Sequence, residues 1–318
     1  MRKLAPVLGI CLLLVVSSGC LQFMEEDMEP DDEMRWLVQR ISDKGREVDM
    51  DFVVIVANGE DLATKGSGTA GGYLAAIDGV AREDLYFGWN GLDSATPWST
   101  SERISAQLNV SKDAGKTVMV VDRCSERGYM WDASEWATES GFLYFASNSA
   151  GLDTIPVYPA DPPGAHRGNV SSLSDAKNHL VLTVPKGWTT RDAYLTELRM
   201  TNYDVLVIDA YYNGTPLTFE EVDSLRTKKH GGSRLVIAVI GLGEVDERQH
   251  VWRDLYHTQP PNWLGDEVSN HEGRHHVKYW EDSWRRVLYK SEGSWLNVVL
   301  DAGFDGVYLM GGDAHEHA

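Results

Sequence analysis

Cysteine and basic residues are scarce in this chain of 318 residues, and each shortage excludes a class of protein. Three cysteines cannot form a disulfide framework or a zinc site with four cysteine ligands. Only 29 lysines and arginines stand against 48 aspartates and glutamates, which gives a net charge of −19 at pH 7. Because nucleic acids and anionic lipid surfaces bind basic patches, we expect neither of them as a partner.

Long apolar runs are scarce too, and the one at residues 4–16 is short for a membrane span. Two basic residues precede this run, and a small-small-cysteine sequence that ends at Cys20 follows it, as in a secretory signal with a lipoprotein processing site. We therefore expect residues 1–20 to be a signal peptide, Cys20 to be lipidated and residues 21–33 to be an acidic tether. This predicts a secreted lipoprotein on the extracytoplasmic face, held to the membrane only by its lipid. An ordinary signal peptide and an uncleaved anchor stay as alternatives.

Short apolar runs alternate with polar helical stretches through residues 34–318, which is typical of parallel strands buried on both faces. The expected strands are residues 52–57, 85–88, 117–121, 180–184, 205–209, 235–240, 276–280 and 306–310. The expected helices include residues 34–44, 100–108, 133–139, 190–200, 219–228 and 283–302. Eight strand–helix units predict a (β/α)8 TIM barrel. An open doubly wound sheet is the second choice, but no glycine-rich phosphate turn follows a strand, and we expect no cofactor.

Residues 156–178 interrupt this alternation with a stretch that is rich in proline, glycine, serine and asparagine. Loops of this length usually serve as linkers or carry function. Neither side of the stretch has enough expected strands to close a barrel alone. We therefore interpret it as a linker within one domain that covers residues 34–318.

Polar side chains follow most of the expected strands, at the edge where barrel enzymes place their active sites. Glycoside hydrolysis needs one carboxylic acid and one carboxylate, and Asp209 and Glu244 form the best candidate pair, with Asp313 assisting. An aspartate after a strand is also a common helix cap, so each of these acids has that second interpretation. The expected substrate-binding residues are the strand-end side chains Asn58, Asp122, Tyr212 and Asn213 and the ring-stacking side chains Trp263, Tyr279 and Trp280.

The C-terminal sequence His315-Glu316-His317 contains residue types that bind metals. Residues at a chain end fray, however, and such a site lacks a rigid support. We therefore expect no metal site in this protein.

Seven segments together resemble the barrel of glycoside hydrolase family 114, the group of endo-α-1,4-polygalactosaminidase. Residues 203–226 (YDVLVIDAYYNGTPLTFEEVDSLR), 234–247, 263–288 and 300–314 resemble its first half, and residues 51–62 (DFVVIVANGEDL), 73–88 and 116–124 resemble its second half. The second half comes first here, which implies a circular permutation with residues 156–178 joining the former ends. A closed barrel tolerates this change, and it places the new chain ends side by side.

The resemblance implies hydrolysis of an amino-sugar polysaccharide, and this acidic chain would attract such a cationic polymer. One departure from the family pattern stands out: Met310 occupies a strand-end position where the family has aspartate. The family's PQN sequence becomes Val56-Ala57-Asn58, which keeps only the asparagine. These changes favour an alternative, a catalytically impaired envelope lipoprotein that binds carbohydrate.

Overall fold

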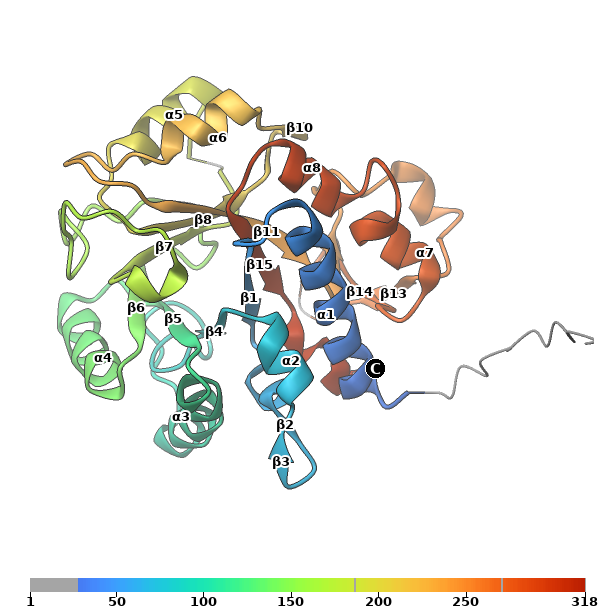
Figure 1. The fold of residues 1–318 in the computed structure, drawn as a ribbon, viewed down its shortest axis with the longest axis horizontal. Coiled ribbons are helices and arrows are strands. Elements are labelled where there is room, and N and C mark those ends of the chain that lie inside the picture. The colour runs from blue at the N-terminus through green and yellow to red at the C-terminus, as the bar shows by residue number, and fades with distance from the viewer. Residues whose placement is uncertain (1–27, 186, 270, 318) are drawn as a thin grey trace, which may run out of the picture.

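The computed structural model describes residues 28–185, 187–269 and 271–317, so the expected signal peptide, Cys20 and most of the tether lie outside the described residues. Eight parallel strands form one nearly closed barrel in the order β6-β5-β4-β1-β15-β11-β8-β7. In chain order they are β1 (Val53–Ala57), β4 (Gly79–Glu83), β5 (Thr117–Arg123), β6 (Leu143–Ser147), β7 (His179–Leu182), β8 (Val205–Asp209), β11 (Leu235–Gly241) and β15 (Gly306–Met310). The predicted (β/α)8 fold class is confirmed (Figure 1).

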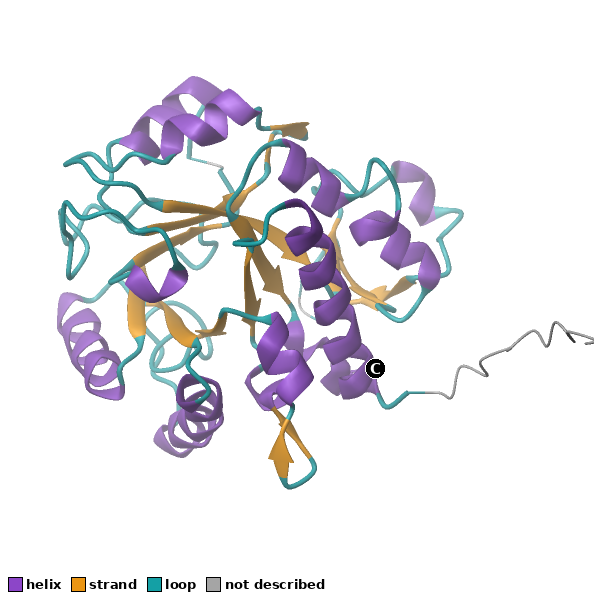
Figure 2. Ribbon diagram, in the orientation of Figure 1, coloured by secondary structure: helices purple, strands orange, loops and turns teal. Residues whose placement is uncertain are grey.

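Helices surround the strands on the outside (Figure 2). The α-helices are α1 (Pro30–Val48), α2 (Gly71–Ala76), α3 (Trp98–Asp113), α4 (Arg127–Ser140), α5 (Arg191–Arg199), α6 (Phe219–Leu225), α7 (Asp282–Arg285) and α8 (Trp295–Asp301). They cover strands whose side chains are buried on both faces; all seven residues of β11, for example, are buried. Among the described residues, no helix combines the length and apolar character that crossing a membrane requires.

Two of the eight expected strands are wrong. The strand expected at residues 85–88 lies earlier, at β4, whose sequence GVARE ends in two charged residues and lacks an apolar run. The strand expected at residues 276–280 belongs instead to β14 (Arg274–Val277), in a small antiparallel sheet with β12 (Glu244–Asp246) and β13 (Leu264–Glu267). The eighth barrel strand is β6, which the sequence prediction missed.

Helix α1 begins at Pro30, four residues before the expected start, so the end of the expected tether is helical. Proline suits the first helical position. The negative charges of Asp31, Asp32 and Glu33 lie in the first turn, where the positive end of the helix dipole stabilises them. The helix expected at residues 283–302 is divided into α7, a π-helical turn and α8. Ser294 caps the N-terminus of α8 by accepting a hydrogen bond from the Asn297 N–H.

The first and last barrel strands pair with each other, so the two ends of the described chain meet. Val53 of β1 lies opposite Gly306 of β15. The C-terminal turn η5 (Gly312–His317) packs on α1, and Figure 1 shows the C terminus beside that helix. The ends are therefore adjacent, as expected, although the first and last units of any closed barrel are neighbours.

The expected linker at residues 156–178 belongs to the connection from β6 to β7, the strands at the two ends of the sheet order. It is fastened to the barrel through Asp204, a buried residue just before β8. This carboxylate lies 3.0 Å from His166 Nε2 and accepts a hydrogen bond of 2.9 Å from the Lys177 N–H. The buried ammonium of Lys228 binds its other oxygen at 2.7 Å. The linker therefore packs against the barrel.

Candidate active site

A cavity of about 460 Å³ opens at the carboxyl ends of the barrel strands. All three expected catalytic residues line it: Asp209 ends β8, Glu244 begins β12, and Asp313 lies in the turn η5 after β15. Because the strands are parallel, their carboxyl ends meet at one edge and bring together residues that are far apart in the sequence. Asp209 and Glu244 therefore face a common cavity, as a catalytic pair must.

Asp209 is a largely buried acid at the end of β8. Its Oδ1 accepts a hydrogen bond of 2.9 Å from the Tyr211 N–H. Burial nevertheless dominates and raises the pKa of Asp209 to about 7. A carboxyl group with this pKa is partly protonated at neutral pH and can therefore act as a general acid.

Asp313 is a second acid with a raised pKa. Burial is the main cause, the negative charges of Glu244 and Glu316 add to it, and the pKa rises to about 6 although Arg82 opposes the change. The tight contact between the η5 turn and the loop after β11 places this side chain: a Cβ on Gly243 would lie 2.0 Å from the Cβ of Ala314. Only glycine at position 243 permits the approach.

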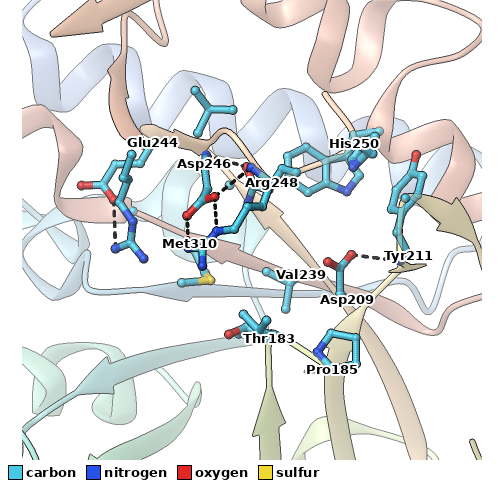
Figure 3. A pocket seen from close by; sticks show the side chains of 18 of the residues that line it. Thr183, Pro185, Asp209, Tyr211, Val239, Glu244, Asp246, Arg248, His250 and Met310 are labelled. Carbon is cyan, nitrogen blue, oxygen red and sulfur yellow. Dashed lines mark hydrogen bonds and ion pairs between the residues drawn. The ribbon is translucent and has the colours of Figure 1, made fainter. Parts of the chain in front are cut away.

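Two further carboxylates are held by arginines. Glu244 lies 3.6 Å from Arg274, and its side chain is 38% exposed. Asp246 accepts hydrogen bonds from the backbone and side chain of Arg248. Burial alone would raise the pKa of Asp246, but the Arg248 hydrogen bonds hold it below its usual value. In Figure 3, Asp209 and Glu244 lie on opposite sides of the pocket, with Asp246 and Arg248 between them.

An aromatic wall closes the side of the pocket next to Asp209. The His250 ring stacks on Tyr211, with 3.6 Å between ring centroids and 12° between planes, and meets Trp295 edge-on. Burial lowers the pKa of His250 to about 4, so this imidazole is neutral at pH 7. Four residues that line the cavity were not among the expected site residues: Tyr211, Arg248, His250 and Trp295. Arg248 and His250 follow β12, and the antiparallel sheet that brings them to the barrel has no local signature.

Of the seven expected substrate-binding residues, Asn58 and Asn213 line the cavity. Both have left-handed backbone conformations, with φ of 58° and 49°, which asparagine tolerates better than most residues. The Asn58 side chain accepts a hydrogen bond of 3.0 Å from the Glu83 N–H and so links the ends of β1 and β4.

Asp122 and Tyr212, which were expected to bind substrate, do not line this cavity. Asp122 is fully buried in β5, where it accepts a hydrogen bond from the Tyr86 N–H, and burial raises its pKa to about 8. The Tyr212 hydroxyl donates to the Trp188 carbonyl at 2.9 Å, and its ring stacks on Tyr194. Both side chains turn toward the protein interior.

The expected ring-stacking residues also lie elsewhere. Trp263 is 2% exposed and packs on Trp284, while the buried Tyr279 donates a hydrogen bond of 2.8 Å to the Pro30 carbonyl. Trp280 is exposed but contacts Tyr279 outside the cavity. Tyr279 and Trp280 were expected at the end of a barrel strand, but residues 276–280 do not form such a strand.

Two residues at the ends of β15 and β4, the strands on either side of β1, complete the cavity. Met310 ends β15 and lines the cavity at the position where the resemblance implies aspartate. Glu83 ends β4 and is paired with Arg123 at 2.7 Å, while Arg123 also holds Asp84 at 2.6 Å. The cavity therefore contains carboxyl groups from several strands and one thioether among them.

No family model matches this chain. An uncharacterized protein of Methanocaldococcus jannaschii is 32% identical over 152 residues, which are 47% of this chain and 41% of that protein. An uncharacterized protein of Thermotoga maritima is 26% identical over 121 residues, which are 38% of this chain and 36% of that protein. The matched regions thus span about two fifths of the length of these curated relatives.

Proposed function

We propose that the barrel cavity is the active site of a glycoside hydrolase that acts on an extracellular polysaccharide containing amino sugars. One observation carries this proposal: the cavity combines Asp209, whose pKa is raised to about 7, with the arginine-paired carboxylate Glu244. Glycoside hydrolysis uses such a pair, one carboxyl group to protonate the leaving oxygen and one carboxylate to act as nucleophile or base.

In this proposal, Asp209 donates a proton to the glycosidic oxygen as the bond to the anomeric carbon breaks. Glu244 acts from the opposite side, either on the anomeric carbon or on a water molecule, and Arg274 lies 3.6 Å from its carboxylate. Asp313 assists by adding negative charge that stabilises the positive charge of an oxocarbenium-like transition state. Asn58 and Asn213 bind sugar hydroxyl groups. The wall of Tyr211 and His250 presents ring surface to a sugar.

The charge of the cavity supports amino sugars as substrates. Five acidic residues line it against two arginines: Glu83, Asp209, Glu244, Asp246 and Asp313 against Arg248 and Arg274. An ammonium group on a partly deacetylated polymer is attracted to this excess of negative charge. The net charge of −19 for the whole chain acts in the same direction.

We also propose that the chain is a circularly permuted relative of the glycoside hydrolase family 114 type. The position of the linker between β6 and β7, the ends of the sheet order, gives independent support. Residues 1–20 and Cys20 would place the protein on the extracytoplasmic face as a lipoprotein.

The release of reducing ends from amino-sugar polymers of graded acetylation tests the proposed reaction. We expect Asp209→Asn and Glu244→Gln to lower turnover by about a hundredfold or more, because each removes one of the two carboxyl functions. The matched control is Asp192→Asn on α5, where the carboxylate is 94% exposed and outside the cavity; it should keep full turnover. Full activity of Glu244→Gln would contradict the proposal.

The second candidate function is a lipoprotein that binds the polymer without cleaving it, and Met310 favours this candidate. A methionine at the end of β15 supplies no proton and no negative charge. The same polymers distinguish the two functions. Binding without turnover, equal in the wild type and in Glu244→Gln, would establish the binding protein and exclude the hydrolase.

A further inference from the structure

A group of metal-ligating side chains lies outside the catalytic pair, where the chain end meets the first barrel unit. Asp61 belongs to the turn η1 (Glu60–Ala63) that follows β1, and His315 and Glu316 belong to η5. One ligand atom from each of these three residues lies within 4.8 Å of the others. His315 and Asp61 are separated by 254 residues, so only the closure of the barrel between β15 and β1 brings them together.

The hydrogen bonds of His315 determine which of its nitrogens faces the group. Nδ1 lies 2.8 Å from the Gly312 carbonyl oxygen, which can only accept, so Nδ1 carries a hydrogen. Nε2 lies 2.8 Å from Asp61 Oδ2. The hydrogen bond at Nδ1 therefore directs Nε2 at the Asp61 carboxylate. Histidine ligands of metals are commonly oriented in this way, with the other ring nitrogen donating to a carbonyl.

Negative charge accumulates around this imidazole. Glu60, the neighbour of Asp61, is 6% exposed, and Arg82 binds its Oε1 at 3.1 Å. Its buried Oε2 has no hydrogen-bond partner within the part of the chain that the structure describes. Asp61 and Glu316 add two more carboxylates, so a dication there would meet an excess of oxygen ligands.

We propose that Asp61, His315 and Glu316 bind one divalent transition-metal ion of the Zn²⁺ class. One imidazole nitrogen with two carboxylate oxygens suits such an ion better than Ca²⁺ or Mg²⁺, which prefer oxygen alone. Ligand atoms about 2.0–2.2 Å from a tetrahedral ion lie about 3.3 Å from one another. Metal binding would therefore lengthen the 2.8 Å distance between His315 Nε2 and Asp61 Oδ2 slightly. The exposed side chain of Glu316 would move to bring its carboxylate to the ion. A water molecule takes the fourth position.

The ion would fasten two parts of the cavity wall to each other. The η5 turn carries Asp313, and the η1 turn follows Asn58 by two residues; both of these side chains line the cavity. Metal binding would thus stabilise the closure of the barrel and hold Asp313 in place. This inference does not depend on the proposed reaction, because it concerns the binding of the metal itself.

Calorimetric titration of the tag-free, metal-stripped full-length chain with ZnCl2 tests the site, together with thermal unfolding with and without zinc. We expect one ion per chain and a higher Tm in the presence of zinc. His315→Ala and the near-isosteric Asp61→Asn should each weaken binding by at least about tenfold and abolish the zinc-dependent rise in Tm.

His317→Ala is the matched control, because this histidine is two positions away in the same turn and its ring faces His276 instead. It should bind zinc like the wild type. Circular dichroism in EDTA shows whether His315→Ala and Asp61→Asn are folded. If one of them is unfolded, zinc binding by the other tests the proposal. Wild-type protein that binds no stoichiometric zinc, or folded His315→Ala and Asp61→Asn that bind as tightly as the wild type, would overturn the proposal.

Discussion

Burial, more than any single neighbouring charge, determines the protonation of the cavity acids. Asp209 and Asp313 both have raised pKa values because the protein excludes water from their carboxyl groups. Asp246 is also partly buried but has a lowered pKa, because Arg248 donates hydrogen bonds to it. Carboxyl groups within one cavity thus differ in protonation at neutral pH, with Asp209 about half protonated and Asp246 ionised, which suits acid–base work.

The pKa of Asp209 leads to a prediction for the pH dependence of turnover. If Asp209 is the general acid, the reaction requires its protonated form, so kcat/KM should fall as pH rises through about 7. The fall should approach tenfold per pH unit on the alkaline side. Initial rates of reducing-end release between pH 5 and pH 9 measure this limb. A rate that rises through this range would contradict the role of Asp209 as the acid.

At the scale of elements, β1 and β15 approach each other closely at Gly306. A Cβ on Gly306 would lie 2.2 Å from the Val53 carbonyl oxygen and 2.7 Å from its Cβ, and strand backbone cannot move aside cheaply. This contact joins the chain's first and last strands and positions η1 and η5, so it supports both the catalytic cavity and the proposed metal site.

Gly306→Ala should therefore lower the free energy of unfolding by about 2–3 kcal/mol through overpacking. Gly71→Ala at the start of α2 is the control, since a Cβ there meets no atom within 4 Å and alanine favours a helix. Urea unfolding followed by circular dichroism compares the two variants with the wild type. Equal stability of Gly306→Ala and Gly71→Ala would show that the β1–β15 contact can relax.

At the scale of the whole molecule, the order of the strands along the sequence can change while their arrangement in the barrel stays the same. The ends of the described chain are adjacent, and the connection from β6 to β7 carries the linker. Within this linker, Val157 is 87% exposed, whereas His166 and Lys177 are fastened to Asp204. The exposed part of the linker is therefore the place where a cut disturbs the fewest contacts.

A permuted variant tests this view. Its present ends are joined by a short glycine–serine linker, and it is opened between Val157 and Tyr158. This change restores the strand order that the family resemblance implies. We expect this variant to fold and to unfold at nearly the same temperature, because every strand keeps its neighbours. Thermal unfolding by circular dichroism measures the comparison. A variant that stays unfolded where the original chain folds would contradict the view that the linker joins two former ends.

The class of fold and the acids of the site follow from the amino-acid pattern alone. Buried parallel strands leave continuous apolar runs, and their carboxyl ends converge on one edge, so the pattern is enough to expect Asp209, Glu244 and Asp313 together. A strand with charged residues, such as β4, leaves no such run and was therefore missed, whereas β6 (LYFAS) has an apolar run that was not assigned to a strand.

Tertiary packing, in contrast, determines which side chains face the cavity and which enter the core. Trp263 and Tyr279 are buried, while Arg248 and His250 reach the site from a small antiparallel sheet beside the barrel. The pKa of Asp209 and the contact between Asp61 and His315 likewise exist only after the barrel closes. Local patterns do not record these features, because burial and the electrostatics that follow from it depend on packing between segments far apart in the chain.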